Sequence, residues 1–450
     1  MKYLLNGAYG AIHGTYWMVY GVITSFASAF LLARGYSNSD IGLILALGSI
    51  FSALAQPFAA DIADRTRRFS LVGLIQIFAA VVLVLTALMF FLKGKTLALT
   101  VVFIMAVAWN AAVQPLVNSL SFKLEVSGYR VHFGIARSIG SLGYALLCAL
   151  LGSLVDRFGA QSVPVSGVLM GAVLLLILHA TKIIFKKACE GREVRFASMA
   201  AGSDDAVSAD TASAETASHP ETAGASRGDA VSANGDYAEL FEKNSAGDID
   251  LKAFVKRNKI FLLSYIGIAA IFFGNATYSN FMLQIAQSVG GDSVDMGRIL
   301  ALCAFAEIPA MLAYDKLQDK ISCRLVLWFS LSGFLIKAIC SYFAQSVALL
   351  YVANTMNLIG FGLFMPAIVY FVNSIMDSGE AVKGQAVYPI VNSVSTVLSS
   401  LLGGYILDVS GAKSLLLLCL VLTVCGAAWF ALLLGKIKSN KGETYERQAI

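Results

Sequence analysis

Apolar runs long enough to cross a membrane recur along this chain of 450 residues. A helix needs about 20 such residues to span roughly 30 Å of hydrocarbon, and about twelve runs meet that length. They lack the alternation of apolar and polar residues that marks the strands of a membrane barrel, so we predict helices. The predicted spans are 4–33, 39–60, 70–92, 97–122, 133–156, 164–185, 260–287, 296–314, 324–344, 347–375, 384–407 and 414–435.

Composition excludes several other classes of protein. Hydrophobic residues make up 58% of the chain and charged residues 14%, whereas a soluble protein has about 25% charged residues. The net charge of +5 therefore does not indicate nucleic-acid binding, since most of the excess flanks apolar runs. The seven cysteines form no CxxC pair, so neither a disulfide framework nor a zinc site is indicated. No Walker, HExxH or GxSxG motif is present, so we predict no enzyme activity and no cofactor.

Residues 188–259 interrupt the apolar pattern. They are rich in Ala, Ser, Asp and Thr and poor in large apolar side chains, so we predict a disordered linker. It separates an N-terminal six-helix bundle, residues 1–187, from a C-terminal bundle, residues 260–435. A tail follows at 436–450.

The basic residues predict the orientation in the membrane. If both termini and the linker are cytoplasmic, most Lys and Arg residues that flank the spans lie inside, as the positive-inside rule requires. We therefore predict a multi-pass protein of the plasma (inner) membrane with cytoplasmic termini. The basic residues left outside are Arg34, Lys93, Lys95, Arg157, Arg298 and Lys413.

The two predicted bundles share a motif. The pattern GxxxDxxGAxS begins at Gly152 and again at Gly404. The same separation pairs Pro57 with Pro309. These matches predict two like-oriented six-helix repeats, an arrangement in which transporters bind solute between the repeats near mid-membrane.

The residues also resemble a known family. The segment that begins Ser37-Asn-Ser-Asp40-Ile-Gly42 and continues to Gln56-Pro57 and Ala63-Asp64-Arg65 resembles the second helix of the lactose permease family. The segment that begins Phe133-Gly134-Ile-Ala-Arg137 and includes Tyr144 resembles its fifth helix. The chain is thus identified as a member of the oligosaccharide–proton symporter branch of the major facilitator superfamily, or a near neighbour. The resemblance implies an all-α integral membrane fold of twelve transmembrane helices.

The superfamily has a signature loop after its second helix, GxLxDRxGRR. Asp64 and Arg65 match the charged pair of this loop, which implies a gating role for them. Ala60 and Arg67 stand where the signature has two glycines, a departure that implies looser packing of the loop.

Few ionisable residues lie deep in the predicted spans. Arg137, Glu307 and Lys337 are buried in apolar sequence, and His13 is a titratable fourth. Charges at this depth are costly and usually functional, and a lone carboxylate there must be protonated or paired. Glu307 therefore either forms a structural ion pair or binds solute and couples protons.

The resemblance assigns roles to some of these residues. It implies that Arg137 and Glu307 bind sugar and that Tyr144 replaces a tryptophan that stacks on the sugar ring. Lys337 aligns with the basic residue of the ninth helix, as a second basic site. The family's other charged positions align with neutral residues here, so its separate proton site is missing. We therefore expect proton coupling to run through Glu307, with His13 as the other candidate.

Neutral polar and aromatic residues complete the predicted solute site. Amide-lined surfaces with some aromatic rings suit polyhydroxylated solutes, although such residues also form hydrogen bonds between membrane helices. The candidates are Trp17, Asn118, Asn275, Asn357 and Asn392.

Together these features predict a secondary active transporter. We expect alternating-access transport of a sugar or glycoside with a proton, by a monomer in the lipid bilayer. An organic-anion transporter of the same superfamily is the alternative, because Arg137 and Lys337 outnumber Glu307. A solute-binding membrane sensor is another alternative.

Overall fold

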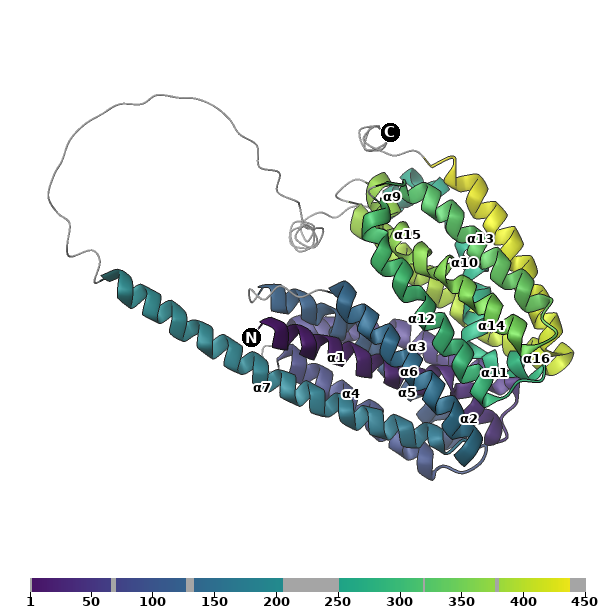
Figure 1. The fold of residues 1–450 in the computed structure, drawn as a ribbon, viewed down its shortest axis with the longest axis horizontal. Helices are drawn as coiled ribbons and strands as arrows, with labels where there is room; N and C mark the ends of the chain where they lie inside the picture. Colours follow the sequence, from purple (N-terminus) through teal and green to yellow (C-terminus); the bar gives the residue numbers. More distant parts are fainter. Residues whose placement is uncertain are drawn as a thin grey trace.

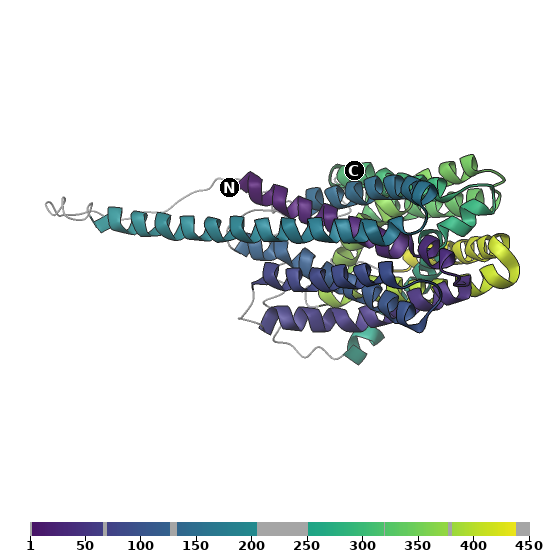
Figure 2. The ribbon, with the colours of Figure 1, turned by 90° about the horizontal axis from the view of Figure 1, so that it is seen from below.

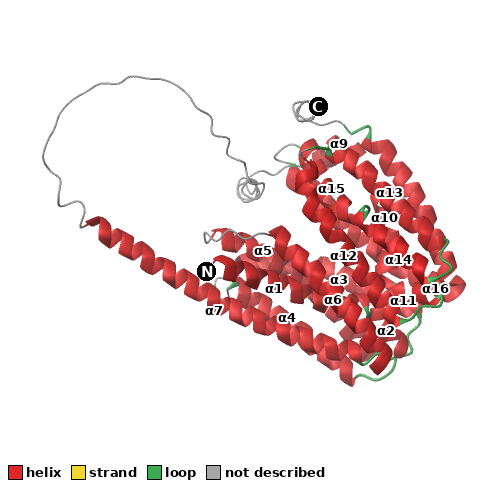
Figure 3. Cartoon of the chain, in the orientation of Figure 1, coloured by secondary structure: helices red, strands yellow, loops and turns green. Residues whose placement is uncertain are grey.

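The fold consists of helices and their connections. A computed structural model describes residues 2–65, 70–126, 133–204, 251–318, 320–376 and 380–437. These residues contain no strand (Figure 3). In lipid a helix satisfies its own backbone hydrogen bonds, which favours this outcome for so apolar a chain. The prediction of an all-α membrane fold is confirmed.

Six membrane crossings form the N-terminal half. The first crossing is bent, because a π-helical segment, η1, separates its two α-helical parts by about one turn. The elements are α1 (Lys2–Tyr20), η1 (Gly21–Ser25), α2 (Ala27–Ala33), α3 (Asn38–Arg65), α4 (Leu71–Phe91), α5 (Leu97–Val126), α6 (Phe133–Phe158) and α7 (Ser162–Asp204).

The C-terminal half begins with a short helix and contains two broken crossings. Its elements are α9 (Leu251–Arg257), α10 (Lys259–Asn280), α11 (Met282–Gln287), α12 (Ser293–Gln318), α13 (Cys323–Tyr342), α14 (Val347–Thr355), η2 (Met356–Leu358), α15 (Phe361–Ile375) and α16 (Ala381–Leu434). Helix α16 crosses twice, because Gly411 has a positive φ of 76° and the chain turns back there (Figure 2).

The described residues account for the predicted crossings. Ten helices in these ranges are long and apolar enough to span a membrane, and the bent pair Tyr3–Ser25 and Ala27–Ala33 adds one more. The turn at Gly411 divides the longest of the ten, Lys383–Leu434, into two spans. The total agrees with the twelve predicted from the sequence.

The predicted linker is partly helical, which corrects its boundaries. Helix α7 continues through residues 188–204, and α9 forms at Leu251–Arg257. Residues 188–204 include Ala, Glu, Arg and Met, and extending an existing helix requires no new nucleation. The side chain of Glu380 fixes the end of α9, since its carboxylate lies 3.2 Å from Arg257 and 2.9 Å from Asn258. Residues 205–250 lie outside the described residues.

The tenth crossing is also interrupted, although the sequence predicted a continuous span over 347–375. A short 3₁₀ turn, η2, separates α14 from α15. Helix α13 packs directly on this break, because a Cβ atom added to Gly333 would collide with the backbone nitrogen of Gly360. Broken helices at membrane depth persist where protein covers them or where they line a cavity.

The two halves meet at one end of the molecule, which we call the sealed side. Figure 1 shows the N-terminal half in purple and blue and the C-terminal half in green and yellow, joined near α2, α11 and the turn of α16. Helix α6 crosses α12 at Gly152 and Gly297, and α3 crosses α16 at Gly42 and Gly404. At each crossing an added Cβ would meet backbone atoms of the other half, so only glycine fits.

One carboxylate also bridges the halves on the sealed side. Asp408 accepts hydrogen bonds from the backbone N–H groups of Asn38 (3.1 Å) and Ser39 (2.7 Å). It therefore caps the N-terminus of α3 in the opposite half. Its counterpart in the repeated motif, Asp156, is exposed, and Asp292 caps α12 instead. The motif is thus duplicated in sequence, and its first glycine contacts the opposite half in both copies, but among the described residues only the aspartate of the second copy forms hydrogen bonds across the halves.

Candidate functional site

A cavity of about 490 Å³ lies between the two halves. Helix α3 lines it with Leu45, Ser49, Ser52 and Gln56, which follow the sealed contact at Gly42 along the same helix. Helix α16 lines it from Tyr388 to Thr396, ahead of the sealed contact at Gly404. The cavity therefore begins at mid-membrane and extends away from the sealed side, toward the end of the molecule where α3 ends and α16 begins.

Arg137 forms the charged part of the N-terminal wall. Its guanidinium carbon lies 3.9 Å from the centre of the Trp17 ring, which is a close cation–π contact. One turn further along α6, Gly140 makes room for the indole, since an added Cβ would lie 2.6 Å from Trp17 Cδ1. The small residues of α6 thus bring Trp17 of α1 against Arg137 and hold the guanidinium at the cavity wall.

Arg137 retains capacity to bind a ligand. Its Nη1 atom is buried and has no hydrogen-bond partner within the described ranges. Arg137 and Glu307 both line the cavity, yet no salt bridge between them occurs among those residues. A buried donor without a partner costs free energy, and a solute acceptor would recover it. The N-terminal wall therefore presents a fixed cation with an available donor.

The C-terminal wall contains a chain of three hydrogen-bonded side chains. Lys337 donates to Asn357 Oδ1 at 2.9 Å, and Asn357 Nδ2 donates to Glu307 Oε1 at 2.7 Å. Lys337 is 4% exposed and its ammonium also lies 4.9 Å from the centre of the Tyr278 ring. Asn357 belongs to the 3₁₀ break η2, so the interrupted helix supplies the link between the buried cation and the carboxylate.

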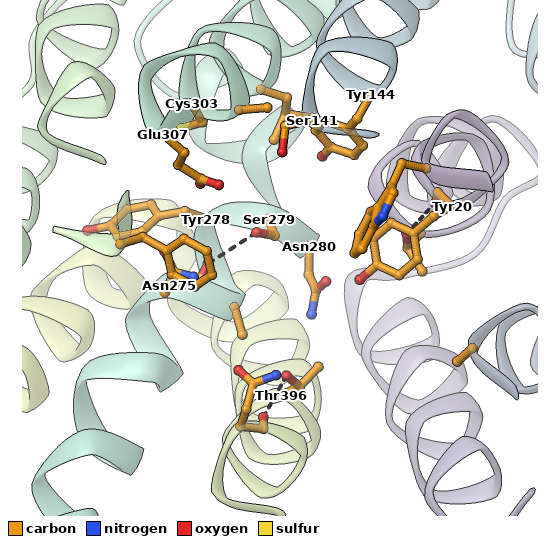
Figure 4. A pocket seen from close by; sticks show the side chains of 18 of the residues that line it. Tyr20, Ser141, Tyr144, Asn275, Tyr278, Ser279, Asn280, Cys303, Glu307 and Thr396 are labelled. Atoms are coloured by element: carbon orange, nitrogen blue, oxygen red, sulfur yellow. Dashed lines mark hydrogen bonds between the residues drawn. The ribbon is translucent and has the colours of Figure 1, made fainter. Parts of the chain in front are cut away.

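Polar side chains from α10 and α16 complete the cavity. Asn275, Ser279 and Asn280 come from the end of α10, and Asn392 and Thr396 from α16. Figure 4 shows the carboxylate of Glu307 directed toward the centre of the pocket, with Tyr20 and Tyr144 on the other wall. The Tyr144 hydroxyl lies 2.7 Å from Ser25 Oγ of η1, so its position is fixed by the π-helical segment.

This arrangement can bind a small polar solute from two sides. One wall offers guanidinium donors and aromatic faces, and the other offers a carboxylate, an ammonium and amides. Glu307 can accept hydrogen bonds when ionised and donate one when protonated. The geometry therefore suits reversible binding of solute near a group that can exchange a proton.

The structure brings most of the predicted site residues together. Eight of them line the cavity: Trp17, Arg137, Tyr144, Asn275, Glu307, Lys337, Asn357 and Asn392.

His13 and Asn118 are not among the cavity-lining residues. His13 is buried one turn before Trp17, where its Nε2 lies 2.9 Å from the Tyr9 hydroxyl. On α5, Gln114 lines the cavity, one turn before Asn118. The sequence therefore indicated the helix that contributes an amide to the cavity, but the residue predicted lies one turn too far along it.

Asp64 and Arg65 form the last turn of α3 rather than a loop. A helix that starts at Asn38 and has good helix formers at its end can continue through them. Residues 66–69, which follow, lie outside the described residues. The gating role predicted for Asp64 and Arg65 stays a prediction.

Sequence reasoning missed several cavity residues. Tyr388 precedes Pro389 in α16 and lines the cavity beside Asn392, one turn away. Extending the Asn392 and Thr396 stripe backward by one turn would have found it. The other missed polar residues include Tyr20, Ser52, Gln56, Ser141, Tyr278 and Asn280.

Comparison with known proteins identifies the family. The MFS_1 like family matches residues 9–418. This chain belongs to the MFS_1 like family. The predicted membership in the major facilitator superfamily is confirmed, and the chain is a membrane transporter of that type. Over 442 residues it is 21% identical to the uncharacterized transporter YwbF of Bacillus subtilis (strain 168), covering 97% of this chain and 95% of YwbF.

A shorter match concerns a sugar transporter. The maltose permease of Geobacillus stearothermophilus is 31% identical over 139 residues, which cover 31% of this chain and 34% of the permease. Among solved structures, the nucleoside transporter NupG superposes with a TM-score of 0.66 at 12% identity, covering 97% of this chain and 100% of NupG. A POT family transporter in complex with 5-aminolevulinic acid superposes with a TM-score of 0.64 at 11% identity, covering 96% of this chain and 95% of that chain. These structural likenesses show the shared fold.

Proposed function

We propose that this MFS_1 like transporter imports a sugar or glycoside together with a proton. It works as a monomer in the plasma membrane with both termini in the cytoplasm, as the distribution of Lys and Arg favours. The sealed side then faces outward and the cavity opens inward. The partial match to a maltose permease supports a sugar, although it covers only a third of either chain.

The observation that carries this proposal is that Arg137 and Glu307 line one amide-rich cavity from opposite halves. Arg137 has a buried N–H donor, at Nη1, without a hydrogen-bond partner among the described residues. Within the same ranges, the side chain that donates a hydrogen bond to Glu307 is Asn357. A polyhydroxylated solute can accept from the guanidinium and donate to the carboxylate at the same time. Trp17 and Tyr144 offer faces for the apolar side of a sugar ring.

Glu307 is the proposed coupling group. A proton drives transport only if it binds the two access states with different affinity. Lys337 reaches Glu307 through Asn357, whereas Arg137 belongs to the other half, so relative motion of the halves changes the electrostatic environment of the carboxylate. Protonated Glu307 would favour solute binding, and loss of the proton would accompany release inside.

Glu307→Gln tests the coupling. The amide imitates the protonated carboxyl, so the variant should retain solute binding and exchange but lose accumulation driven by a pH gradient. Uptake and counterflow in proteoliposomes measure the two properties separately. Asp156→Asn, an exposed acid outside the cavity, is the matched control and should behave as wild type. If Glu307→Gln still accumulates solute in response to a pH gradient, Glu307 is not the coupling group.

An organic anion is the second candidate substrate. Two cations, Arg137 and Lys337, line the cavity against one carboxylate, and the free donor of Arg137 suits a carboxylate as well as hydroxyls. A thermal-shift screen of sugars against organic acids discriminates between the two, because a ligand that binds only the folded protein stabilises it by an amount that grows with the ratio of ligand concentration to Kd. Uptake of the stabilising compound into proteoliposomes then distinguishes transport from the binding expected of a sensor.

A further inference from the structure

A second hollow lies on the outer surface of the molecule, where the two halves cross. This lateral groove, of about 420 Å³, runs between α6 of the N-terminal half and α12 of the C-terminal half. It lies beside the Gly152–Gly297 contact of the sealed side. Its lining is almost wholly apolar and includes Leu142, Ala145, Leu146, Ala149, Ala301 and Phe305.

Two matching stripes of side chains shape the groove. On α6 the lining residues recur at positions 142, 145, 146 and 149, and on α12 at positions 298, 301, 302 and 305. Both follow the spacing of one helix face, so each stripe is about 10 Å long. The alanines leave space, while Leu142, Leu146 and Phe305 are 50%, 54% and 57% exposed. The groove is therefore apolar along its length and open to the bilayer.

The groove is polar at one end. Arg298 and Tyr351 line it near the start of α12, on the sealed side. Tyr351 donates a hydrogen bond to Asp295 Oδ1 at 3.1 Å. Asp295 and Arg298 lie one turn apart on α12, so a cation and a carboxylate occur together at the end of the span, where lipid headgroups lie.

We propose that this groove binds one phospholipid with a primary-amine headgroup, in the leaflet of the sealed side. Its acyl chain fills the apolar stripes, its phosphate pairs with Arg298, and its ammonium pairs with Asp295. A purely anionic headgroup would satisfy Arg298 but leave Asp295 next to a like charge. A choline headgroup would have no N–H to donate to the carboxylate.

A lipid in this position would act on the transport cycle. The groove is built by both halves, and the crossing beside it must separate before the cavity can open on the sealed side. A bound lipid contacts α6 and α12 together only while that crossing is closed. It therefore stabilises the conformation described here by its differential affinity for the two states.

Native mass spectrometry of the full-length protein tests the proposal. The protein is reconstituted in vesicles of phosphatidylethanolamine with phosphatidylglycerol, or of phosphatidylcholine with phosphatidylglycerol, and then extracted in mild detergent. Wild type should retain one molecule of phosphatidylethanolamine. Retention of phosphatidylcholine should be about tenfold lower, since its headgroup cannot donate the hydrogen bond to the Asp295 carboxylate. Arg298→Gln should lower retention of either lipid about tenfold. Arg157→Gln, an exposed basic residue at the end of α6 outside the groove, should match wild type.

A second variant separates the groove from the charge. Ala149→Leu fills the apolar stripe from a partly exposed position without altering Arg298 or Asp295, and it should reduce retention of both lipids while gel-filtration behaviour is unchanged. Retention at the wild-type level in both Arg298→Gln and Ala149→Leu would overturn the site. Equal retention of phosphatidylethanolamine and phosphatidylcholine by wild type would overturn the pairing of the amine with Asp295.

Discussion

Replacing Arg137 by lysine is expected to weaken solute binding roughly 10- to 100-fold. The guanidinium carbon lies 3.9 Å from the centre of the Trp17 ring, and Nη1 has no hydrogen-bond partner among the described residues. An ammonium carries the same charge, but it presents a compact point charge in place of a planar fork, and it stacks less well on the indole. The loss should therefore appear in affinity, although net charge is preserved.

Isothermal titration with the solute found by the thermal-shift screen measures this loss. Arg157→Lys, at the exposed end of the same helix, is the matched control and should bind as wild type. Arg137→Lys should elute normally in gel filtration, because its aliphatic stem can still cover Trp17. If Arg137→Lys binds with wild-type affinity, Arg137 holds α1 against α6 and is not a solute ligand.

Hydropathy and spacing predicted most of the fold. The number of crossings and the helices follow from the length of apolar runs, and the division into two repeats follows from the duplicated motif. The breaks were not predicted, because they depend on contacts between helices. Gly360 and Gly333 approach each other only in the folded bundle. The turn at Gly411 differs from these breaks, because it falls in the predicted gap between the spans 384–407 and 414–435, where Asp408 and Lys413 interrupt the apolar run.

The candidate site was predicted in part for a similar reason. Residues with unusual chemistry at membrane depth, such as Arg137, Glu307 and Lys337, are conspicuous in an apolar sequence. His13 is equally conspicuous, but it packs beside Tyr9 and does not line the cavity. His13 and Asn118 each lie one turn from a cavity-lining residue of the same helix, Trp17 and Gln114. The face of a helix can therefore be predicted from the spacing of its polar residues, whereas the depth at which the cavity ends is fixed by the packing of the two halves.

Enlarging the glycines of the sealed side should have the second large effect, a shift of the conformational equilibrium. A Cβ at Gly152 would lie 2.5 Å from the Ser293 carbonyl oxygen of the opposite half. Overpacking of this kind costs about 1–3 kcal/mol, which corresponds to a shift of roughly 5- to 150-fold between two states. Gly152→Ala should therefore favour the state in which α6 and α12 have separated and the cavity opens on the sealed side.

Gly134→Ala provides the matched control for this shift. Gly134 belongs to the same helix, and a Cβ added there would meet nothing within 4 Å. Helix propensity does not fall in either variant, because both replace glycine by alanine within α6. Any difference between them thus reports the contact with α12 and not the stability of α6 itself.

Cys303 gives a native readout of the opening. Its thiol lines the cavity, 3.1 Å from Asn354 Oδ1. Because the glycine contacts of the sealed side close the cavity at that end, they shield this thiol from one side of the membrane. A membrane-impermeant thiol reagent added to intact cells should modify Cys303 slowly in wild type and in Gly134→Ala, and much faster in Gly152→Ala. Peptide mapping assigns the modified cysteine. If Cys303 in a folded Gly152→Ala protein stays as unreactive as in wild type, the α6–α12 crossing does not control access from that side. Faster modification would instead establish that the two glycines close the cavity by backbone contact, since one methyl group suffices to part the helices.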